Sequence, residues 1–160
     1  MSVAFDTRRR HFLTTLARLT GAGLALSAVQ LAGASPLPQV DVWKSPTCGC
    51  CNDWIKHLEA SGFTVKATNV PDSRHVRARF GMPAKYASCH TALVGGYVVE
   101  GHVPAREIKR LLREKPAARG LSVPGMPVGS PGMEMGDRRD PYNVVAFTKD
   151  GRRSVFAQYR

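Results

Sequence analysis

The part of the sequence most informative about the fold is residues 40–67, VDVWKSPTCGCCNDWIKHLEASGFTVKA. It opens with a short β-rich run at residues 40–43, and a turn-like segment leads from there to Cys48. Between residues 50 and 60 apolar side chains recur at helical spacing, and Gly62 ends the predicted helix. Residues 63–67 then alternate as a strand does. A strand, a helix and a strand in this order predict a parallel pair with a right-handed crossover.

The next part of the chain adds a second helix, a hairpin and a third helix. Residues 71–80 predict the second helix. Residues 91–94 and 97–99, joined by two glycines, predict an antiparallel hairpin. Residues 104–114 place their apolar side chains on one helical face. The order β-α-β-α-β-β-α predicts an α/β, thioredoxin-like fold with a mixed sheet.

The C-terminal part has a different composition. Residues 120–136 are rich in proline and glycine and predict an irregular loop. This loop holds three of the chain's five methionines: Met126, Met133 and Met135. Residues 143–148 and 154–159 flank Asp150-Gly151, which predicts a second β-hairpin.

The first 34 residues read as an export signal. A basic start at residues 8–10 precedes a weakly apolar run, and Ala32-Gly33-Ala34 has the small-residue form of a cleavage site. Residues 9–13 also resemble a twin-arginine signal, which we favour over an ordinary secretory signal or a retained N-terminal anchor. We therefore expect residues 1–34 to be a signal peptide, residues 38–160 to form one domain, and the protein to be periplasmic.

The chain is basic, with a formal net charge of +11. Removal of residues 1–34 takes away four Arg and one Asp and leaves +8. The basic residues are scattered and are not interleaved with aromatic ones, so we expect a solvated surface and no nucleic-acid partner. Attraction to an anionic membrane surface or partner is the weaker alternative. No internal apolar run is long enough to predict a transmembrane segment in the mature chain.

The chemistry-bearing residues are four cysteines: Cys48, Cys50, Cys51 and Cys89. The first three lie at a predicted helix start, where free backbone N–H groups and the helix dipole stabilise thiolates. In a thioredoxin-like sheet the segment before the third strand lies beside this junction, so Cys89 is expected to approach the trio.

Disulfides and metal binding both fit these cysteines. An oxidising compartment favours disulfides, and two pairing schemes are open: 48–51 with 50–89, or 48–50 with 51–89. Crowded thiolates raise one another's pKa, however, and a cation removes that repulsion. Soft thiolates select Cu(I), zinc or iron–sulfur centres. Because the spacing fits neither a zinc ribbon nor a common iron–sulfur run, we expect copper, with a redox disulfide or a structural bridge as alternatives.

Histidines and methionines supply candidate auxiliary ligands. His90 follows Cys89 and His102 follows the hairpin, so both could reach the metal, whereas surface or supporting roles are the alternative. A regular strand would point His90 away from Cys89, so an irregular backbone is needed there. Thioethers are soft ligands too; the alternative for Met126, Met133 and Met135 is that they fill gaps beneath the loop.

Three longer stretches carry a family resemblance: KSPTCGCC, SCHTALVGGYVVEGHVPA and GLSVPGMPVGSPGMEMG. They resemble a domain-of-unknown-function family of exported, thioredoxin-like metal-binding proteins, the CopG-type copper-resistance proteins. The resemblance covers residues 40–159. It implies a multi-copper site on the four cysteines and interconversion of Cu(I) and Cu(II) in copper detoxification, so a copper oxidoreductase activity is open.

The favoured function is therefore an exported protein that holds copper in a cysteine-rich site for copper resistance. A thiol-disulfide oxidoreductase that uses Cys48 and Cys51 is the first alternative, although Ser88-Cys89-His90 lacks the proline that thioredoxins carry before the third strand. A copper metallochaperone is the second. Expected partners are copper ions and either a copper exporter or a periplasmic electron donor.

Overall fold

The computed structural model describes residues 36–160, so the predicted signal peptide lies outside the described residues. The elements in chain order are β1 Val40–Lys44, α1 Gly49–Ala60, β2 Val65–Asn69, α2 Arg74–Arg79, the 3-10 turn η2 Ala84–Tyr86, β3 His90–Val94, β4 Tyr97–Glu100, α3 Ala105–Glu114, β5 Gly120–Ser122, β6 Tyr142–Phe147 and β7 Arg153–Tyr159. The predicted order β-α-β-α-β-β-α is confirmed for the part of the chain up to α3.

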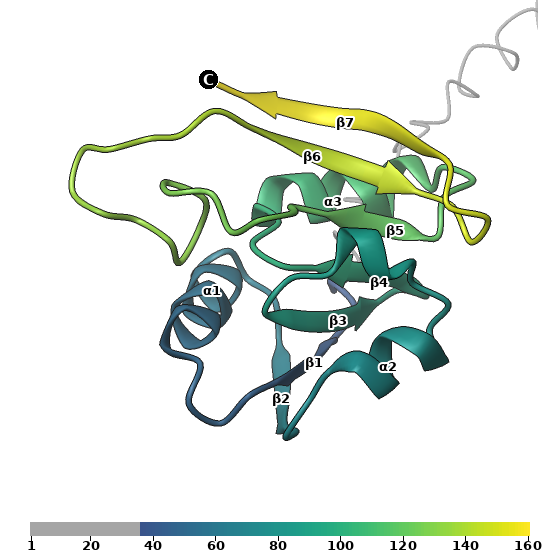
Figure 1. Cartoon of the computed structure of the whole chain (residues 1–160), viewed down its shortest axis with the longest axis horizontal. Coiled ribbons are helices and arrows are strands. Elements are labelled where there is room, and N and C mark those ends of the chain that lie inside the picture. Colours follow the sequence, from purple (N-terminus) through teal and green to yellow (C-terminus); the bar gives the residue numbers. More distant parts are fainter. Residues whose placement is uncertain (1–35) are drawn as a thin grey trace, which may run out of the picture. The chain divides into compact units, whose positions relative to one another are not determined.

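All described strands belong to one mixed sheet of order β2-β1-β3-β4-β5-β6-β7, which Figure 1 shows from β2 at the bottom to β7 at the top. The pair β1–β2 is parallel, as the strand-helix-strand order predicts, and β3–β4 is an antiparallel hairpin. The strand β3 also pairs antiparallel with β1, which places Lys44 opposite His90. The start of β3 therefore lies beside the end of β1, where α1 begins.

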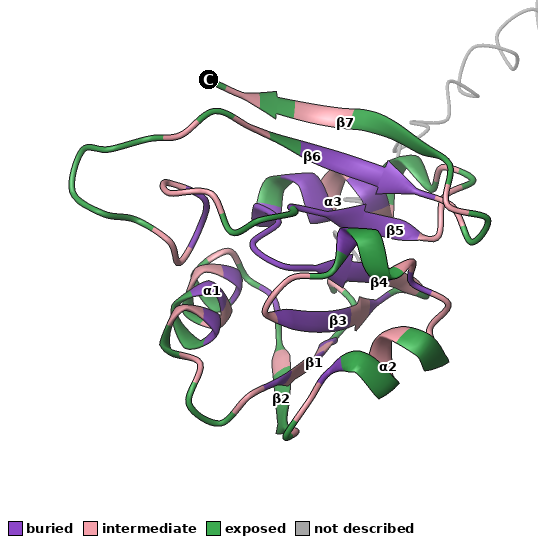
Figure 2. Cartoon of the chain, in the orientation of Figure 1, coloured by how far each residue is buried: buried purple, intermediate pink, exposed green. Residues whose placement is uncertain are grey.

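Side chains from α1 and α3 fill the core on one face of the sheet. Trp54, Leu58, Ile108 and Leu111 are fully buried there, and alternate strand residues such as Val99 meet them. The opposite face holds a smaller cluster beneath α2 and η2: Met82, Tyr86, Val98, Val145 and Phe147. Neighbouring strand residues such as Val98 and Val99 therefore serve opposite faces, as the strand period of two requires. Figure 2 shows the resulting buried centre of the sheet.

The prediction that residues 120–136 form only an irregular loop is wrong at their start. Gly120–Ser122 form β5, which pairs parallel with β4 and antiparallel with β6. A Cβ at Gly120 would lie 1.8 Å from the carbonyl oxygen of Val98, so only glycine allows this approach. Three residues that begin with glycine carry no periodic signal, yet this short strand joins the C-terminal hairpin to the thioredoxin-like sheet.

Two other predicted elements are shifted or shorter. The second strand occupies Val65–Asn69, two residues later than predicted, and the preceding Phe63 is buried in the core. The second helix covers only Arg74–Arg79; before it, a carboxylate oxygen of Asp72 accepts a hydrogen bond from the backbone N–H of Arg74. Local side-chain bonding of this kind favours a turn over the first turn of a helix.

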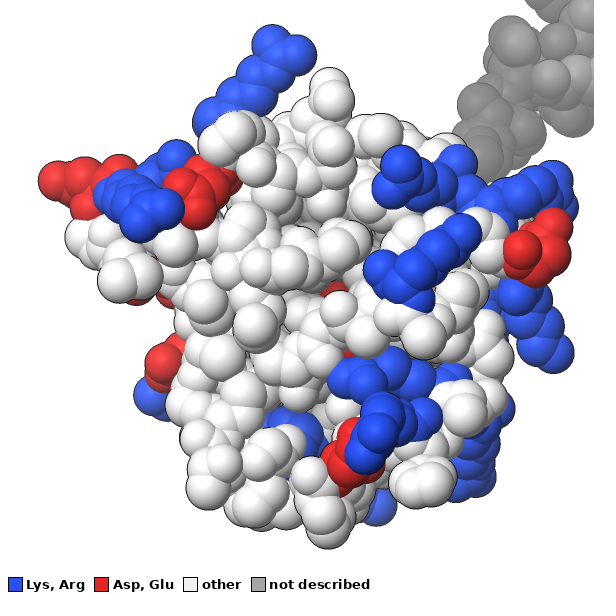
Figure 3. All heavy atoms as spheres, in the orientation of Figure 1, with Lys and Arg blue, Asp and Glu red and all other residues white. Residues whose placement is uncertain are grey.

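No helix in residues 36–160 is long and apolar enough to span a bilayer. Figure 3 shows the Lys and Arg side chains of one face in separate groups, some of them beside acidic side chains. Exposed ion pairs of the described residues include Lys56–Asp53 and Arg152–Asp150. The expected solvated surface without a nucleic-acid partner stays a prediction.

Candidate metal centre

The cysteine trio lies where strand β1 turns into helix α1. Cys48 is the residue before the helix, with an extended backbone (φ −78°, ψ 96°), and the helix begins at Gly49. No side chain caps this helix start, so a negative charge on the nearby sulfurs would be stabilised by the helix N-terminus without competition from a side-chain cap. Cys51 is buried, whereas Cys48 and Cys50 are half-buried. The trio is therefore held on a rigid element with two members open to solvent.

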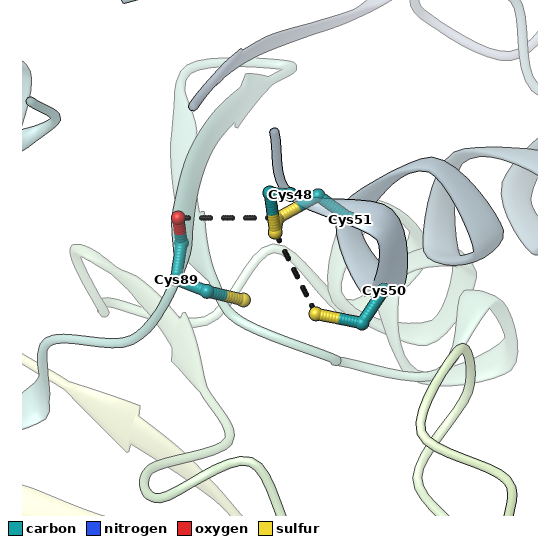
Figure 4. Close-up of side chains that lie close together, drawn as sticks. All are labelled: Cys48, Cys50, Cys51 and Cys89. Atoms are coloured by element: carbon teal, nitrogen blue, oxygen red, sulfur yellow. Dashed lines mark hydrogen bonds between the residues drawn. A yellow bond between two sulfur atoms is a disulfide. The ribbon is translucent and has the colours of Figure 1, made fainter. Parts of the chain in front are cut away.

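A disulfide joins Cys48 and Cys51, and Cys50 and Cys89 are free thiols. This is one bond of the first predicted pairing scheme. The second bond of that scheme is not formed. Figure 4 shows the Cys50 and Cys89 side chains pointing toward each other beside the disulfide, and the Cys50 and Cys48 sulfurs are 3.5 Å apart.

Cys89 meets the trio because β3 pairs with β1. The Sγ atoms of all four cysteines lie within 4.8 Å of one another. Two sulfurs bound to one metal at about 2.3 Å are about 3.8 Å apart at a tetrahedral angle and about 4.6 Å apart at a linear one. The observed spacing fits shared metal ions, provided that the disulfide is first reduced.

A second donor set shares Cys89 and extends inward from the cluster. The Sγ of Cys89 lies 3.3 Å from Nδ1 of His90 and 3.1 Å from Nε2 of His102, and both histidines are fully buried. Cys89 precedes the first residue of β3, so the strand alternation that would separate it from His90 does not apply. Nε2 of His90 is a buried polar atom with no hydrogen-bond partner among the described residues. Buried imidazole nitrogens beside a thiol suit a metal ion.

Burial sets the protonation states of these groups. Burial, together with the charge of Cys50, raises the pKa of the Cys89 thiol to about 12. Burial, together with His102, lowers the pKa of His90 to about 3, and burial also lowers the pKa of His102. Without metal, Cys89 therefore keeps its proton at neutral pH while His90 stays neutral and free to ligate.

The loop after β5 closes over the N-terminus of α1. Nδ1 of His102 hydrogen-bonds to the carbonyl oxygen of Pro131 at 2.7 Å. The next residue, Gly132, has φ +81°, and a Cβ there would lie 2.6 Å from the backbone nitrogen of Trp54 and 2.8 Å from the carbonyl oxygen of Cys50. One loop segment thus contacts both the histidine and the cysteine helix.

The three loop methionines differ in exposure. Met126 is 40% exposed and Met135 is 62% exposed, whereas Met133, directly after Gly132, is half-buried. Met133 thus follows the residue that docks on α1. The role of all three as ligands stays a prediction.

Several residues that support this centre carry no motif. The Trp54 indole N–H donates to the carbonyl oxygen of Val103, and its ring lies 4.3 Å from the His90 ring. Arg77 and Glu100 form an ion pair beside Ser88. In the sequence, that pair is indicated only by Glu100, a charged residue at the end of an otherwise apolar strand. Nε2 of His57 accepts a hydrogen bond from the backbone N–H of Ala105.

Comparison with known proteins places the chain in a family. Residues 86–133 match the model of a family described as proteins of unknown function, DUF411, and no curated protein matches the chain. Two solved structures, of copper resistance protein CopG in forms 1 and 2, share 53% and 52% sequence identity with it. They cover 77% and 78% of this chain and 98% and 99% of their own length, each with a TM-score of 0.73. With that fold and a four-cysteine cluster able to hold metal, the chain belongs to the CopG family of copper resistance proteins.

Proposed function

We propose that this protein is exported and binds copper as its cargo in the cysteine cluster, as part of copper resistance. The observation that carries the proposal is the approach of four sulfur atoms to within 4.8 Å of one another at one helix start. Its relatives of known structure are named as copper resistance proteins. Export to the periplasm rests on the N-terminal signal predicted from the sequence.

Copper suits this donor set better than harder or more strictly tetrahedral ions do. Thiolates are soft donors that select Cu(I), and each can bridge two ions when several sulfurs are crowded. In this proposal Cys48, Cys50, Cys51 and Cys89 are the primary ligands. His90 and His102 supply buried neutral nitrogens from the inner side, and Met126, Met133 and Met135 supply thioethers from the loop.

Copper binding by all four cysteines requires two electrons to open the Cys48–Cys51 disulfide. A periplasmic thiol or electron donor is the partner that this step needs. Interconversion of Cu(I) and Cu(II) at the cluster would add a one-electron donor or acceptor from outside the chain. Delivery of the bound copper to an exporter is the metallochaperone version of the same proposal, and copper-transfer kinetics test it.

Elemental analysis combined with X-ray absorption tests the copper proposal directly. Protein isolated from the exported compartment and then reduced should retain copper in preference to zinc. Its copper edge should report sulfur ligands at about 2.3 Å. Protein that retains zinc or no metal after exposure to Cu(I) under reducing conditions would contradict the proposal.

The Cys48–Cys51 disulfide favours a second candidate, a thiol-disulfide oxidoreductase. In this mechanism a thiol reductant first opens the Cys48–Cys51 disulfide. The Cys48 thiolate then attacks a substrate disulfide and releases one substrate thiol, and Cys51 attacks the mixed disulfide, which releases the second substrate thiol and restores the Cys48–Cys51 bond. Catalysis of insulin reduction by metal-free protein that retains no copper would favour this candidate. Copper retention without thiol turnover would favour the copper-binding function.

A further inference from the structure

A buried ion pair lies directly behind the segment that carries Cys89. The guanidinium Nε of Arg77, on α2, is 2.9 Å from Oε1 of Glu100 at the end of β4. The Glu100 side chain is fully buried, and only 13% of the Arg77 side chain is exposed. An isolated charge at this depth is strongly unfavourable, so each side chain depends on the other.

Both members of the pair bind the backbone of Ser88, the residue before Cys89. Oε1 of Glu100 accepts the Ser88 backbone N–H at 2.6 Å. Nη2 of Arg77 donates to the Ser88 carbonyl oxygen, also at 2.6 Å. Because β3 begins only at His90, Ser88 lies outside the sheet ladder, and the ion pair replaces the hydrogen bonds that a strand would supply.

The Glu100 carboxylate also binds Thr91, the residue that follows Cys89-His90. Oε2 of Glu100 accepts a hydrogen bond from Oγ1 of Thr91 at 2.7 Å. Glu100 therefore binds the residues on both sides of Cys89-His90. A charge-assisted hydrogen bond on each side restricts the motion of this segment more than neutral contacts would.

The two residues after Glu100 also contact the segment that carries Cys89. The backbone N–H of Gly101 donates to the carbonyl oxygen of His90, and His102 contacts the Cys89 sulfur. A Cβ at Gly101 would lie 2.5 Å from Oγ of Ser88, so these two segments of the chain are in close contact. Three consecutive residues, 100–102, thus each contact the segment that carries the thiol.

We propose that Arg77 and Glu100 are positioning residues that hold the Cys89 thiol toward Cys50 and His102 and thereby set the geometry of the metal centre. This inference rests on the proposed copper-binding function for its metal-dependent part only. The alternative is that the pair merely stabilises the turn before β3. The two are separable because positioning acts on one thiol, whereas general stabilisation acts on the whole domain.

The test compares Glu100→Gln with the matched control Glu107→Gln. Glu107 is also a buried glutamate in ion pairs with arginines, but it lies on α3 and bonds Arg106, Arg110 and Tyr159 instead of the thiol segment. Arg77→Lys is a milder second variant that keeps the charge and loses the planar fork needed to bind both Glu100 and Ser88. It keeps the test valid if Glu100→Gln does not fold.

The first readout needs no metal. Alkylation at fixed pH, with peptide mapping, gives separate rates for the two free thiols, Cys50 and Cys89. We expect Glu100→Gln to change the Cys89 rate, relative to the Cys50 rate, on the order of tenfold, the effect of losing a hydrogen bond to a charged group. Glu107→Gln should leave the ratio unchanged. Equal ratios in both variants and the wild type would overturn the inference.

The second readout is the copper X-ray absorption spectrum of the reduced, Cu(I)-loaded proteins. Glu100→Gln should lower the sulfur coordination number while Glu107→Gln keeps the wild-type spectrum. Identical spectra together with an unchanged alkylation ratio would show that the pair only stabilises the turn. If the wild type binds no copper, the copper proposal fails, and the alkylation ratio alone decides the positioning role.

Discussion

The Sγ of Cys89 lies 3.1 Å from Nε2 of His102, although the two residues are 13 positions apart in the chain. The contact forms because β3 and β4 are a hairpin whose open end faces the start of α1. The other ring nitrogen of His102 bonds the loop at Pro131. The Cys89–His102 contact therefore links the cysteine site, through the hairpin, to the loop.

Replacement of Cys89 by Ser should sharply lower the copper content of the reduced protein. A serine hydroxyl is a hard donor that stays protonated, and the distal sulfur belongs to both donor sets. The loss of affinity should exceed the roughly 10–100-fold typical of residues outside the ligand sphere. Elemental analysis after Cu(I) loading measures it, with His75→Gln at an exposed position as the control. Unchanged stoichiometry would remove Cys89 from the site.

Reduction of the disulfide should raise the capacity for copper. Thiol titration of denatured protein should give two thiols before reduction and four after it, because only Cys50 and Cys89 are free. Disulfide sulfurs are poor ligands compared with thiolates. Copper titrations of the oxidised and reduced protein, followed by absorption in the thiolate-to-copper region, should reach a higher end point after reduction. Equal end points would contradict a ligand role for Cys48 and Cys51.

Copper affinity should rise with pH through the neutral range. The Cys89 thiol, with its pKa raised to about 12 by burial and by Cys50, is protonated at neutral pH, so a metal must displace its proton. Calorimetry in buffers of different ionisation enthalpy should detect proton release on Cu(I) binding to the reduced protein. In Cys89→Ser the number of protons released should fall. Binding without any proton release would contradict this protonation state.

Acidification should destabilise the metal-free protein. The pKa of His90 is lowered to about 3 by burial, whereas the pKa of a histidine in the unfolded chain is about 6.5. Between these values the unfolded chain binds a proton that folded His90 does not, so the free energy of unfolding falls as pH falls. Urea denaturation of His90→Asn at several pH values should show a shallower fall than the wild type. Part of the pH dependence should remain in His90→Asn, because burial also lowers the pKa values of His57 and His102. A slope in His90→Asn equal to that of the wild type would exclude His90 as its source.

Gly132→Ala should detach the loop from α1. The new Cβ would meet backbone atoms of Trp54 and Cys50, which cannot move away as a flexible side chain could. Gly125→Ala is the matched control, because Gly125 has φ +77°, against φ +81° at Gly132, and a Cβ added at Gly125 would meet nothing within 4 Å. Both variants should lose about 1–2 kcal/mol of stability from the left-handed backbone. Only Gly132→Ala should lose roughly 1–3 kcal/mol more from overpacking and show faster proteolysis within the loop. Equal losses would mean that this contact does not dock the loop.

The thioredoxin-like part of the fold could be predicted from local patterns in the sequence. Residues 40–67 carry an apolar period that changes from strand to helix and back, and each change is marked by glycine or turn residues. The glycine pair at 95–96 identified the hairpin in the same way. These signals are local, so they can be recognised without knowledge of the tertiary contacts.

The sequence also identified the four cysteines and indicated that Cys89 returns to the first helix. That inference succeeded because the third strand of the predicted thioredoxin-like sheet does pair with the first. The actual bond between Cys48 and Cys51, with Cys50 and Cys89 left free, was one of several options that spacing alone could not separate.

The remaining contacts of the metal centre depend on tertiary packing and could not be predicted from local patterns. Strand β5 is three residues long and exists because β4 and β6 lie on either side of it. The fork of Arg77 around Ser88, the carboxylate of Glu100 and the carbonyl of Pro131 involve residues 11 to 29 positions from their partners. Such contacts depend on side-chain direction and chain crossing, and no local period encodes either.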